Sequence, residues 1–303
     1  MQLTGQLYDR RRVLRLAALT GAGVASALIL GCSNENKKEQ SALPTSPPTA
    51  VPPSGFLDSD GVKIHYETYG EGAPIVLVHG FAASIKLNWT GTGWVDTLQP
   101  VRRVVALDCR GHGPSDKPHD PAAYDSEKMR QDVLNLMDYL GIEKADLFGY
   151  SMGSFISAGL LAYHGERFTS VVLGGTGDVT KGLPVDTGRS IAAALAADDP
   201  STVTDPVGLG FRAFAESDPN NDLKALAACS GNPAPPIDAS AFARVDIPVL
   251  IVKGANDATT EDADPTAAVI PGAKLVLIPD TDHLTVVPDQ RFKDAVLDFL
   301  RQE

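Results

Sequence analysis

Short, unbroken apolar runs recur along this chain, and they constrain its fold more than any other feature of the sequence. Each run is long enough for one strand and has no polar face, which is typical of strands buried on both sides in a parallel sheet. Segments with helical spacing lie between the runs, for example 125–140, whose apolar residues recur every three or four positions. Strands that alternate with helices predict a mostly parallel central sheet with helices on both faces. The runs are "APIVLVHG", "RRVVALDCRGHG", "KADLFGY", "TSVVLGG", "IPVLIVKG" and "AKLVLIPD", and two strands joined by a Ser-Asp-Gly turn precede them in 56–72.

One segment, 176–246, interrupts this alternation. It contains no clear strand, and its stretches "TGRSIAAALAADDP", "VGLGFRAFAES" and "NDLKALAACSG" favour short helices broken by proline and glycine. An insertion after the sixth strand would lie over the carboxyl edge of the sheet, where α/β proteins bind their ligands. We therefore predict a small helical cap at about 178–243 that forms the substrate pocket; a surface elaboration without contact to substrate is the alternative. The apolar residues expected in the pocket wall are Leu195, Leu209, Phe211, Phe214 and Leu226.

The first residues of the chain are typical of an export signal rather than of a folded domain. Four arginines between positions 10 and 15 precede an apolar stretch, 16–31, that is short for a membrane-spanning helix. The paired arginines resemble the twin-arginine export motif, and "ILGC" resembles the bacterial lipobox, in which a peptidase cuts before a lipidated cysteine. We predict a signal peptide over 1–31 and a lipid anchor at Cys32, with an uncleaved membrane anchor as the alternative. Either would place the protein outside the cytoplasm, on a bacterial membrane and facing the periplasm or the cell exterior.

The segment 32–55 is rich in serine, proline and charge and has almost nothing to bury, so we predict a disordered tether there. The folded domain is then expected over 56–303. Two cysteines remain in it, Cys109 and Cys229; free thiols are the default expectation, and a disulfide between them is the alternative.

The charge balance excludes one class of partner. The formal net charge is −12, and removal of residues 1–31, with their four arginines and one aspartate, makes the remainder more acidic still. Phosphate backbones need a basic surface, so nucleic acid is not an expected partner. The same charge disfavours anionic substrates during encounter, although salt screens this effect.

A serine stands between two glycines in "GYSMG" (149–153), directly after the apolar run 145–150 and before a helical segment. A strand–turn–helix context of this kind forces a tight turn that lifts the Ser151 hydroxyl above the sheet. The helix N-terminus behind it favours developing negative charge. Ser151 is therefore the candidate nucleophile, provided that the chain supplies a base.

The base and its partner are expected at the carboxyl ends of later strands. Asp257 follows the run "IPVLIVKG" and His283 follows "AKLVLIPD", which gives the chain order serine, acid, histidine. Asp178, after the sixth strand, is the alternative acid. His79 and His112 precede the serine and are disfavoured as bases, and Asp282 is expected to be an ordinary loop acid.

These motifs together resemble the α/β-hydrolase superfamily, in its carboxylesterase-like branch with a single inserted cap. "HGFAAS" is similar to the oxyanion-loop motif, "DCRGHGPSDKP" to the signature after the fourth strand, and "GYSMG" to the nucleophile elbow. "GANDATT" is similar to the acid turn and "DTDH" to the histidine loop. The resemblance implies Ser151 as nucleophile, His283 as general base and then acid, and Asp257 as the group that orients His283. It also implies an oxyanion hole made by the backbone N–H groups of Phe81 and Met152.

A serine nucleophile implies an acyl-enzyme, so the expected reaction is hydrolysis of neutral carboxylic esters or lactones. Carbon–carbon bond hydrolases and cofactor-free haloperoxidases share the same triad and stay open as alternatives. A lipid-anchored binding protein with a vestigial triad is the alternative from another class. No cofactor and no metal are expected, because the sequence has neither a phosphate loop nor a His/Cys cluster with ligand spacing. A monomer is expected.

Overall fold

The computed structural model describes residues 53–260 and 262–302. The predicted signal peptide, Cys32 and nearly all of the predicted tether lie outside the described residues. The first strand begins at Ser54, inside the segment predicted as tether, rather than at Phe56. Within the described ranges, no helix is both long enough and apolar enough to cross a bilayer.

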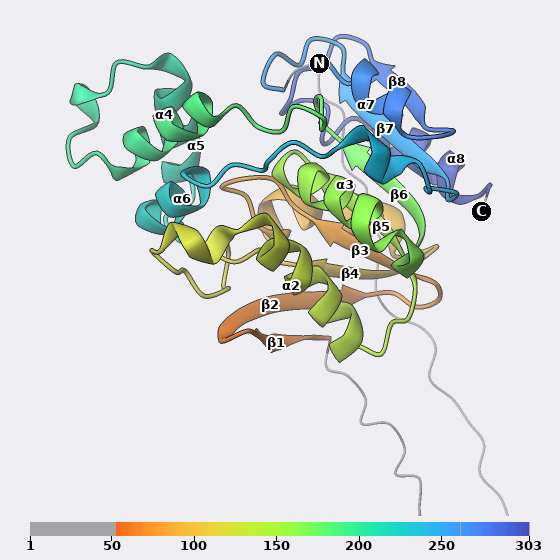
Figure 1. The fold of residues 1–303 in the computed structure, drawn as a ribbon. Coiled ribbons are helices and arrows are strands. Elements are labelled where there is room, and N and C mark those ends of the chain that lie inside the picture. The colour runs from red at the N-terminus through yellow and green to blue at the C-terminus, as the bar shows by residue number, and fades with distance from the viewer. Residues whose placement is uncertain (1–52, 261, 303) are drawn as a thin grey trace, which may run out of the picture. The chain divides into compact units, whose positions relative to one another are not determined.

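The described strands form one sheet in the order β1-β2-β4-β3-β5-β6-β7-β8 (Figure 1). The pairs β1–β2 and β2–β4 are antiparallel, and every other neighbouring pair is parallel, so the predicted mostly parallel sheet is confirmed. The strands are β1 Ser54–Ser59, β2 Val62–Tyr69, β3 Pro74–Val78, β4 Arg103–Leu107, β5 Ala145–Tyr150, β6 Phe168–Gly174, β7 Val249–Gly254 and β8 Lys274–Ile278.

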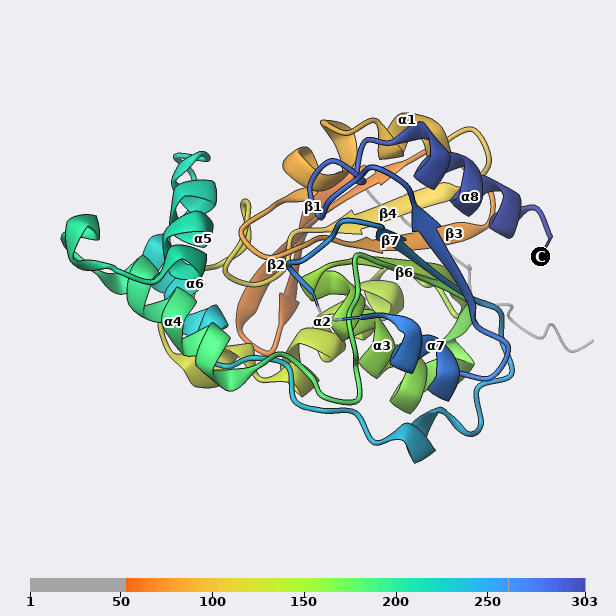
Figure 2. The ribbon, with the colours of Figure 1, turned by 90° about the horizontal axis from the view of Figure 1, so that it is seen from above.

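Helices cover both faces of this sheet, as Figure 2 shows from above. One face carries α1 (Trp94–Leu98) and α8 (Gln290–Leu300), and the other carries α2 (Ser126–Tyr139), α3 (Met152–His164) and α7 (Asp264–Val269). Successive strand residues point to opposite faces. In β3, Ile75 and Leu77 belong to the core under α1 and α8, whereas Val76 and Val78 belong to the core under α2 and α3. This two-sided burial is the reason that the strands read as unbroken apolar runs.

The cap follows β6, as predicted, and consists mainly of three helices that project from the rest of the domain (Figure 1). They are α4 (Val185–Ala196), α5 (Pro206–Glu216) and α6 (Leu223–Ser230). Aspartates cap the last two: Asp205 accepts the Gly208 N–H, and Asp222 accepts the N–H groups of Lys224 and Ala225. Shorter helical turns are η1 Ile85–Thr90, of π type, and the 3₁₀ turns η2 Pro121–Tyr124, η3 Gly165–Arg167, η4 Pro200–Thr202 and η5 Ala239–Phe242.

The cap has a small core of its own, which corrects one expectation. Leu195 and Leu226 are 2% and 0% exposed and pack with Ile191 and Ala215 inside the cap. They stabilise the three-helix unit instead of lining a pocket. Leu209 is 38% exposed, and Phe211 packs against the edge of this core.

Both tryptophans belong to the core on the α1/α8 face. Trp89 and Trp94 are fully buried, and the rings of Phe148 and Phe292 pack edge-on against Trp94. The Trp94 indole N–H donates a 2.8 Å hydrogen bond to the carbonyl of Val287. Trp94 thus ties the first helix to the segment that follows the last strand.

Candidate active site

The turn between β5 and α3 is as tight as the sequence predicts. Ser151 has φ 52° and ψ −116°, a backbone conformation that residues with a side chain rarely adopt. A Cβ at Gly149 would lie 2.1 Å from the carbonyl oxygen of Gly153, and a Cβ at Gly153 would lie 2.0 Å from the carbonyl oxygen of Val78. Both glycines are required by lack of space, while the strained φ falls on the serine between them.

Three predicted residues meet at this turn, although they come from three separate loops. His283 Nε2 lies 2.9 Å from Ser151 Oγ, and His283 Nδ1 lies 2.7 Å from Asp257 Oδ2. Because the carboxylate can only accept, Nδ1 carries the proton, and Nε2 is left to accept from the serine hydroxyl. Asp257 and His283 are 8% and 9% exposed, and Ser151 is half-buried. The arrangement can activate a hydroxyl nucleophile through an oriented base.

The carboxylate of Asp257 is held in its ionised form. Burial alone would raise its pKa, but the hydrogen bond and charge of His283, the Thr259 N–H and the charge of Lys253 outweigh burial and lower the pKa. The Thr259 N–H donates to Asp257 Oδ1 at 2.9 Å, and Lys253 Nζ lies 4.0 Å from Oδ2. Lys253 Nζ also donates to the carbonyl and hydroxyl oxygens of Thr260, so it ties the acid turn to the end of β7.

The competing residues have other partners. Asp178 accepts hydrogen bonds from the backbone N–H and the hydroxyl of Thr180 and forms an ion pair with Lys181. The carboxylate that contacts Nδ1 of His283 is that of Asp257. Asp282 accepts the N–H groups of residues 284 and 285 and shapes the histidine loop. His112 is fully buried, and burial, with the charge of His79, lowers its pKa to about 3.

The loop after β3 lies directly against the nucleophile. A Cβ at Gly80 would be 3.2 Å from the Cβ of Ser151, so the backbone of this loop closely approaches the nucleophile. Phe81 is the next residue, at the position expected for an oxyanion donor. The Gly80 carbonyl accepts from the Ala83 N–H at 3.2 Å and lies 2.7 Å from His79 Nδ1. In a trans peptide the N–H points opposite to the carbonyl, so these bonds direct the Phe81 N–H away from His79.

The protonation state of His79 follows from its partners. The Cys109 N–H donates to His79 Nε2 at 3.0 Å, which leaves Nδ1 as the donor to the Gly80 carbonyl. Burial is the main cause that lowers the His79 pKa, so the ring is neutral. His79 therefore supports the loop and does not act as a base toward Ser151.

Met152, the other residue expected to supply an oxyanion donor, is the first residue of helix α3, where the first N–H groups have no acceptor within the helix.

Two supporting residues of this site, Tyr150 and Asn88, were not predicted from the sequence. The Tyr150 hydroxyl donates to the His283 carbonyl, which fixes the backbone of the histidine loop. Asn88 Oδ1 accepts the Gly80 N–H at 2.9 Å and anchors the start of the oxyanion loop. Tyr150 lies inside the nucleophile motif, so its position could have suggested a role; Asn88 could not have been found, because an isolated asparagine in a helical turn is ordinary.

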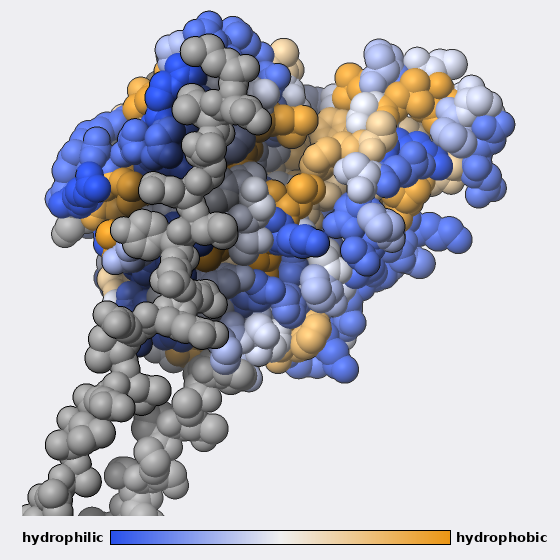
Figure 3. Space-filling view, turned by 180° about the vertical axis from the view of Figure 1, so that it is seen from behind, coloured by the Kyte–Doolittle hydropathy of each residue, from blue (hydrophilic) through white to orange (hydrophobic). Residues whose placement is uncertain are grey.

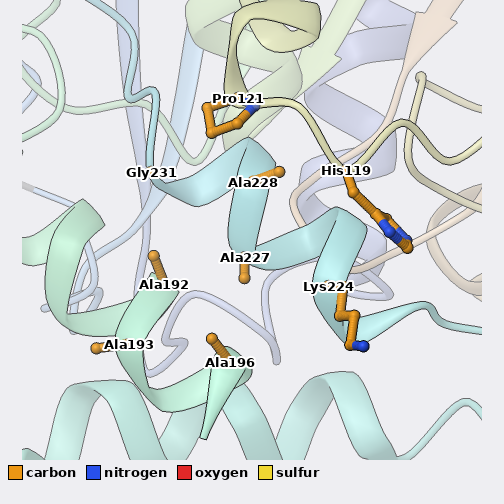
Figure 4. A pocket seen from close by; sticks show the side chains of 9 residues that line it. All are labelled: His119, Pro121, Ala192, Ala193, Ala196, Lys224, Ala227, Ala228 and Gly231. Atoms are coloured by element: carbon orange, nitrogen blue, oxygen red, sulfur yellow. The ribbon is translucent and has the colours of Figure 1, made fainter.

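The described residues were also compared with the requirements of metal, thiol and pocket chemistry outside the triad. Among residues 53–260 and 262–302, no group of three or more His, Cys, Asp or Glu side chains could hold a metal ion. Cys109 and Cys229 are buried free thiols, and burial raises the pKa of both. A shallow groove of about 440 Å³ lies between α4 and α6, beside His119 and Lys224 (Figure 4). Small side chains line most of it and it does not include the triad.

A doubly covered, mostly parallel sheet with a serine at a strained strand–helix turn defines the α/β-hydrolase class. The sequence model of the alpha/beta hydrolase fold matches residues 73–226, and the chain belongs to this family. The 2-hydroxymuconate semialdehyde hydrolase of Pseudomonas putida is 32% identical over 132 residues, which are 44% of this chain and 46% of that protein. The chain matches less than half the length of the first curated relatives.

Solved structures extend the likeness over the whole described domain. A hydrolase from Pseudomonas aeruginosa PA01 is 28% identical, with a TM-score of 0.69 over 82% of this chain and 98% of that one. The structure of Est816, described as an N-acyl homoserine lactone degrading enzyme, is 27% identical, with a TM-score of 0.62 over 81% of this chain and all of that one. These relatives are described as hydrolases or as a degrading enzyme, so the chain groups with enzymes.

Proposed function

We propose that this protein is a serine hydrolase that cleaves neutral carboxylic esters or lactones through an acyl-enzyme. The observation that carries the proposal is the continuous hydrogen-bonded chain from Ser151 Oγ through the His283 ring to Asp257. The lactone part is supported by the lactone degrading enzyme among the similar structures. An N-terminal lipid anchor at Cys32, with the enzyme facing outward from a bacterial membrane, belongs to the same proposal.

The reaction would proceed in two halves. Ser151 Oγ attacks the carbonyl carbon as its proton passes to His283 Nε2, and Asp257 stabilises the imidazolium that forms. The carbonyl oxygen becomes an oxyanion that accepts from the Phe81 and Met152 N–H groups. Collapse releases the alcohol, which takes the proton from His283. Water then attacks the acyl-enzyme with His283 as base, and the carboxylic acid and free Ser151 result.

The surface supports an apolar, uncharged substrate. Apolar residues gather where the cap meets the rest of the domain, seen from behind in Figure 3. On the cap itself, Val185, Val207 and Leu209 are large apolar residues with substantial exposure. The net charge of −12 adds a mild repulsion toward anions. Neutral esters are therefore expected to be better substrates than anionic esters of the same size.

The first test uses short-chain p-nitrophenyl esters and the full-length protein. Hydrolysis should occur without added metal, and Ser151→Ala should lose on the order of a thousandfold or more in turnover, because a triad acts as a unit. A serine-reactive phosphonate should inactivate the wild type in a one-to-one ratio. Activity that survives in Ser151→Ala, or a wild type that binds esters without turning them over, would refute the proposal.

A second candidate function is favoured by the semialdehyde hydrolase among the relatives: hydrolysis of a carbon–carbon bond next to a ketone. A panel of esters, lactones, thioesters, amides and a vinylogous diketone separates the two, together with a peroxide-dependent halogenation assay for the haloperoxidase alternative. An ester or lactone should lead the panel. If the diketone or the halogenation assay exceeds every ester by a large factor, that alternative replaces the esterase proposal.

A further inference from the structure

Asparagine side chains fix the oxyanion loop at both ends, one from the turn that follows the loop and one from the cap, 139 residues away in the sequence. At its start, Asn88 Oδ1 accepts the Gly80 N–H at 2.9 Å. At its end, Asn221 Nδ2 donates to the Ala82 carbonyl at 3.2 Å. The Phe81 N–H, the expected oxyanion donor, lies between these two points. Asn88 belongs to the turn that follows the loop, whereas Asn221 belongs to the cap.

Asn221 connects the cap to the loop through a single amide group. It lies between α5 and α6, is half-buried, and its Nδ2 also donates to the Ala215 carbonyl at 3.0 Å. Both hydrogens of the amide nitrogen are therefore used, one on a cap carbonyl and one on the loop carbonyl. The last turn of α5 and the oxyanion loop are held at a fixed separation by this bridge.

The loop needs such support because its backbone is strained. Ala82 has φ 55°, in the left-handed region that residues other than glycine occupy only when their surroundings hold them. Ala82 is 1% exposed, and it packs into the cap core with Ile191 and Leu226. The conformation of the loop thus depends on contacts with the cap.

The cap also touches both residues whose N–H groups are the expected oxyanion donors. The Phe81 and Phe211 rings pack edge to face, with centroids 5.9 Å apart. The Met152 sulfur lies 4.0 Å from Cys229 Sγ on α6. Helices α5 and α6 of the cap therefore pack against the two residues of the expected oxyanion hole.

We infer that Asn221 is a positioning residue for catalysis: its hydrogen bond to the Ala82 carbonyl holds the oxyanion loop so that the Phe81 N–H faces the oxyanion. The inference rests on the proposed function. Removal of one oxyanion donor costs on the order of a hundredfold to a thousandfold in kcat, and a misplaced donor costs part of that. Loss of the Asn221 bond should therefore lower kcat by about tenfold to a hundredfold and leave KM within about twofold.

The test compares Asn221→Asp and Asn221→Ala with the neighbouring Asn220→Ala in the full-length protein. Aspartate is nearly isosteric but carries no hydrogen for either carbonyl. Asn220 is exposed, and its side chain donates to Asp218, so it is a matched control. Rates are normalised by titration of Ser151 with a phosphonate, so that only correctly folded sites are counted. An alkylboronic acid, which forms a tetrahedral adduct on the serine, probes the oxyanion hole directly.

Both Asn221 variants should lose kcat and boronic-acid affinity by similar factors, with KM nearly unchanged, and Asn220→Ala should match the wild type. If kcat per titrated site stays within threefold of wild type in both, or if only KM rises, the inference is wrong. Should neither variant give titratable sites, Asn221→Ser, which keeps one short donor, decides by the same criteria. Failure of the proposed function is recognised separately, since it would leave the wild type itself inactive or Ser151→Ala active.

Discussion

The strained backbone at Ser151 predicts that the protein is more stable with glycine than with alanine at this position. A side chain at φ 52° and ψ −116° costs about 1–3 kcal/mol, which glycine does not pay. Glycine in turn lowers the free energy of unfolding by about 0.5–1 kcal/mol, because it raises the entropy of the unfolded chain. Ser151→Ala and Ser151→Gly both lose the hydrogen bond to His283, so their difference isolates the backbone. Ser151→Gly should exceed Ser151→Ala by about 1 kcal/mol in the free energy of unfolding.

The measurement is urea or thermal unfolding of the two variants side by side. For a domain of this size, about 1 kcal/mol corresponds to roughly 2–4 °C in Tm. Ala193→Gly, on the exposed side of α4, is the control for the same replacement at an ordinary helical φ, and it should lose about 1 kcal/mol. The expected result is that replacement of alanine by glycine stabilises the protein at position 151 and destabilises it at position 193. A glycine variant less stable than the alanine variant would show that the Ser151 backbone is not strained, and the argument would be discarded.

Two further predictions concern the acid and the buried imidazoles. Asp257→Asn should lower turnover on the order of a thousandfold or more with the fold retained, because the wrong His283 tautomer is favoured. Asp178→Asn should keep turnover within a few-fold of the wild-type value. Steady-state ester kinetics of both variants are the measurement, and the reverse result would assign the acid to Asp178. Burial lowers the pKa of His112 to about 3, whereas the unfolded chain has the ordinary histidine pKa of about 6.5. Below about pH 6.5 the unfolded chain therefore binds a proton at His112 that the folded chain does not bind, and the free energy of unfolding should fall as the pH is lowered. Between pH 6.5 and 5 this amounts to about 2 kcal/mol, measured by urea unfolding at both values. The variant His112→Phe should lose correspondingly less, and an equal loss in both proteins would contradict the assignment.

Much of the fold could be predicted because it depends on local patterns. The unbroken apolar runs predict strands buried on both faces, and every run became a strand of the sheet. The helical segment expected directly after Ser151 is α3, Met152–His164. The glycines of "GYSMG" were expected to permit a tight turn, and the space around Gly149 and Gly153 gives the physical reason.

The remainder depends on tertiary contacts that leave no local pattern. Leu195 and Leu226 have the spacing of apolar helix residues, but periodicity does not say whether an apolar face meets substrate or another cap helix. The bond from Asn221 to the Ala82 carbonyl joins residues 139 positions apart, and the left-handed Ala82 looks like any other alanine in the sequence. The candidate triad could be predicted by chain order, whereas the supports of the oxyanion loop could not.

The placement of both tryptophans in one core layer makes intrinsic fluorescence a selective optical probe of this molecule. Trp89 and Trp94 are the two tryptophans of the chain, and Trp94 is bonded to Val287, just beyond the histidine loop. Their emission will report whether α8 and the segment after β8 are docked on the sheet. The cap helices, 185–230, contain neither tryptophan nor tyrosine. Local opening of the cap should therefore change the intrinsic fluorescence very little. Measurement of cap opening requires an introduced fluorophore or hydrogen exchange.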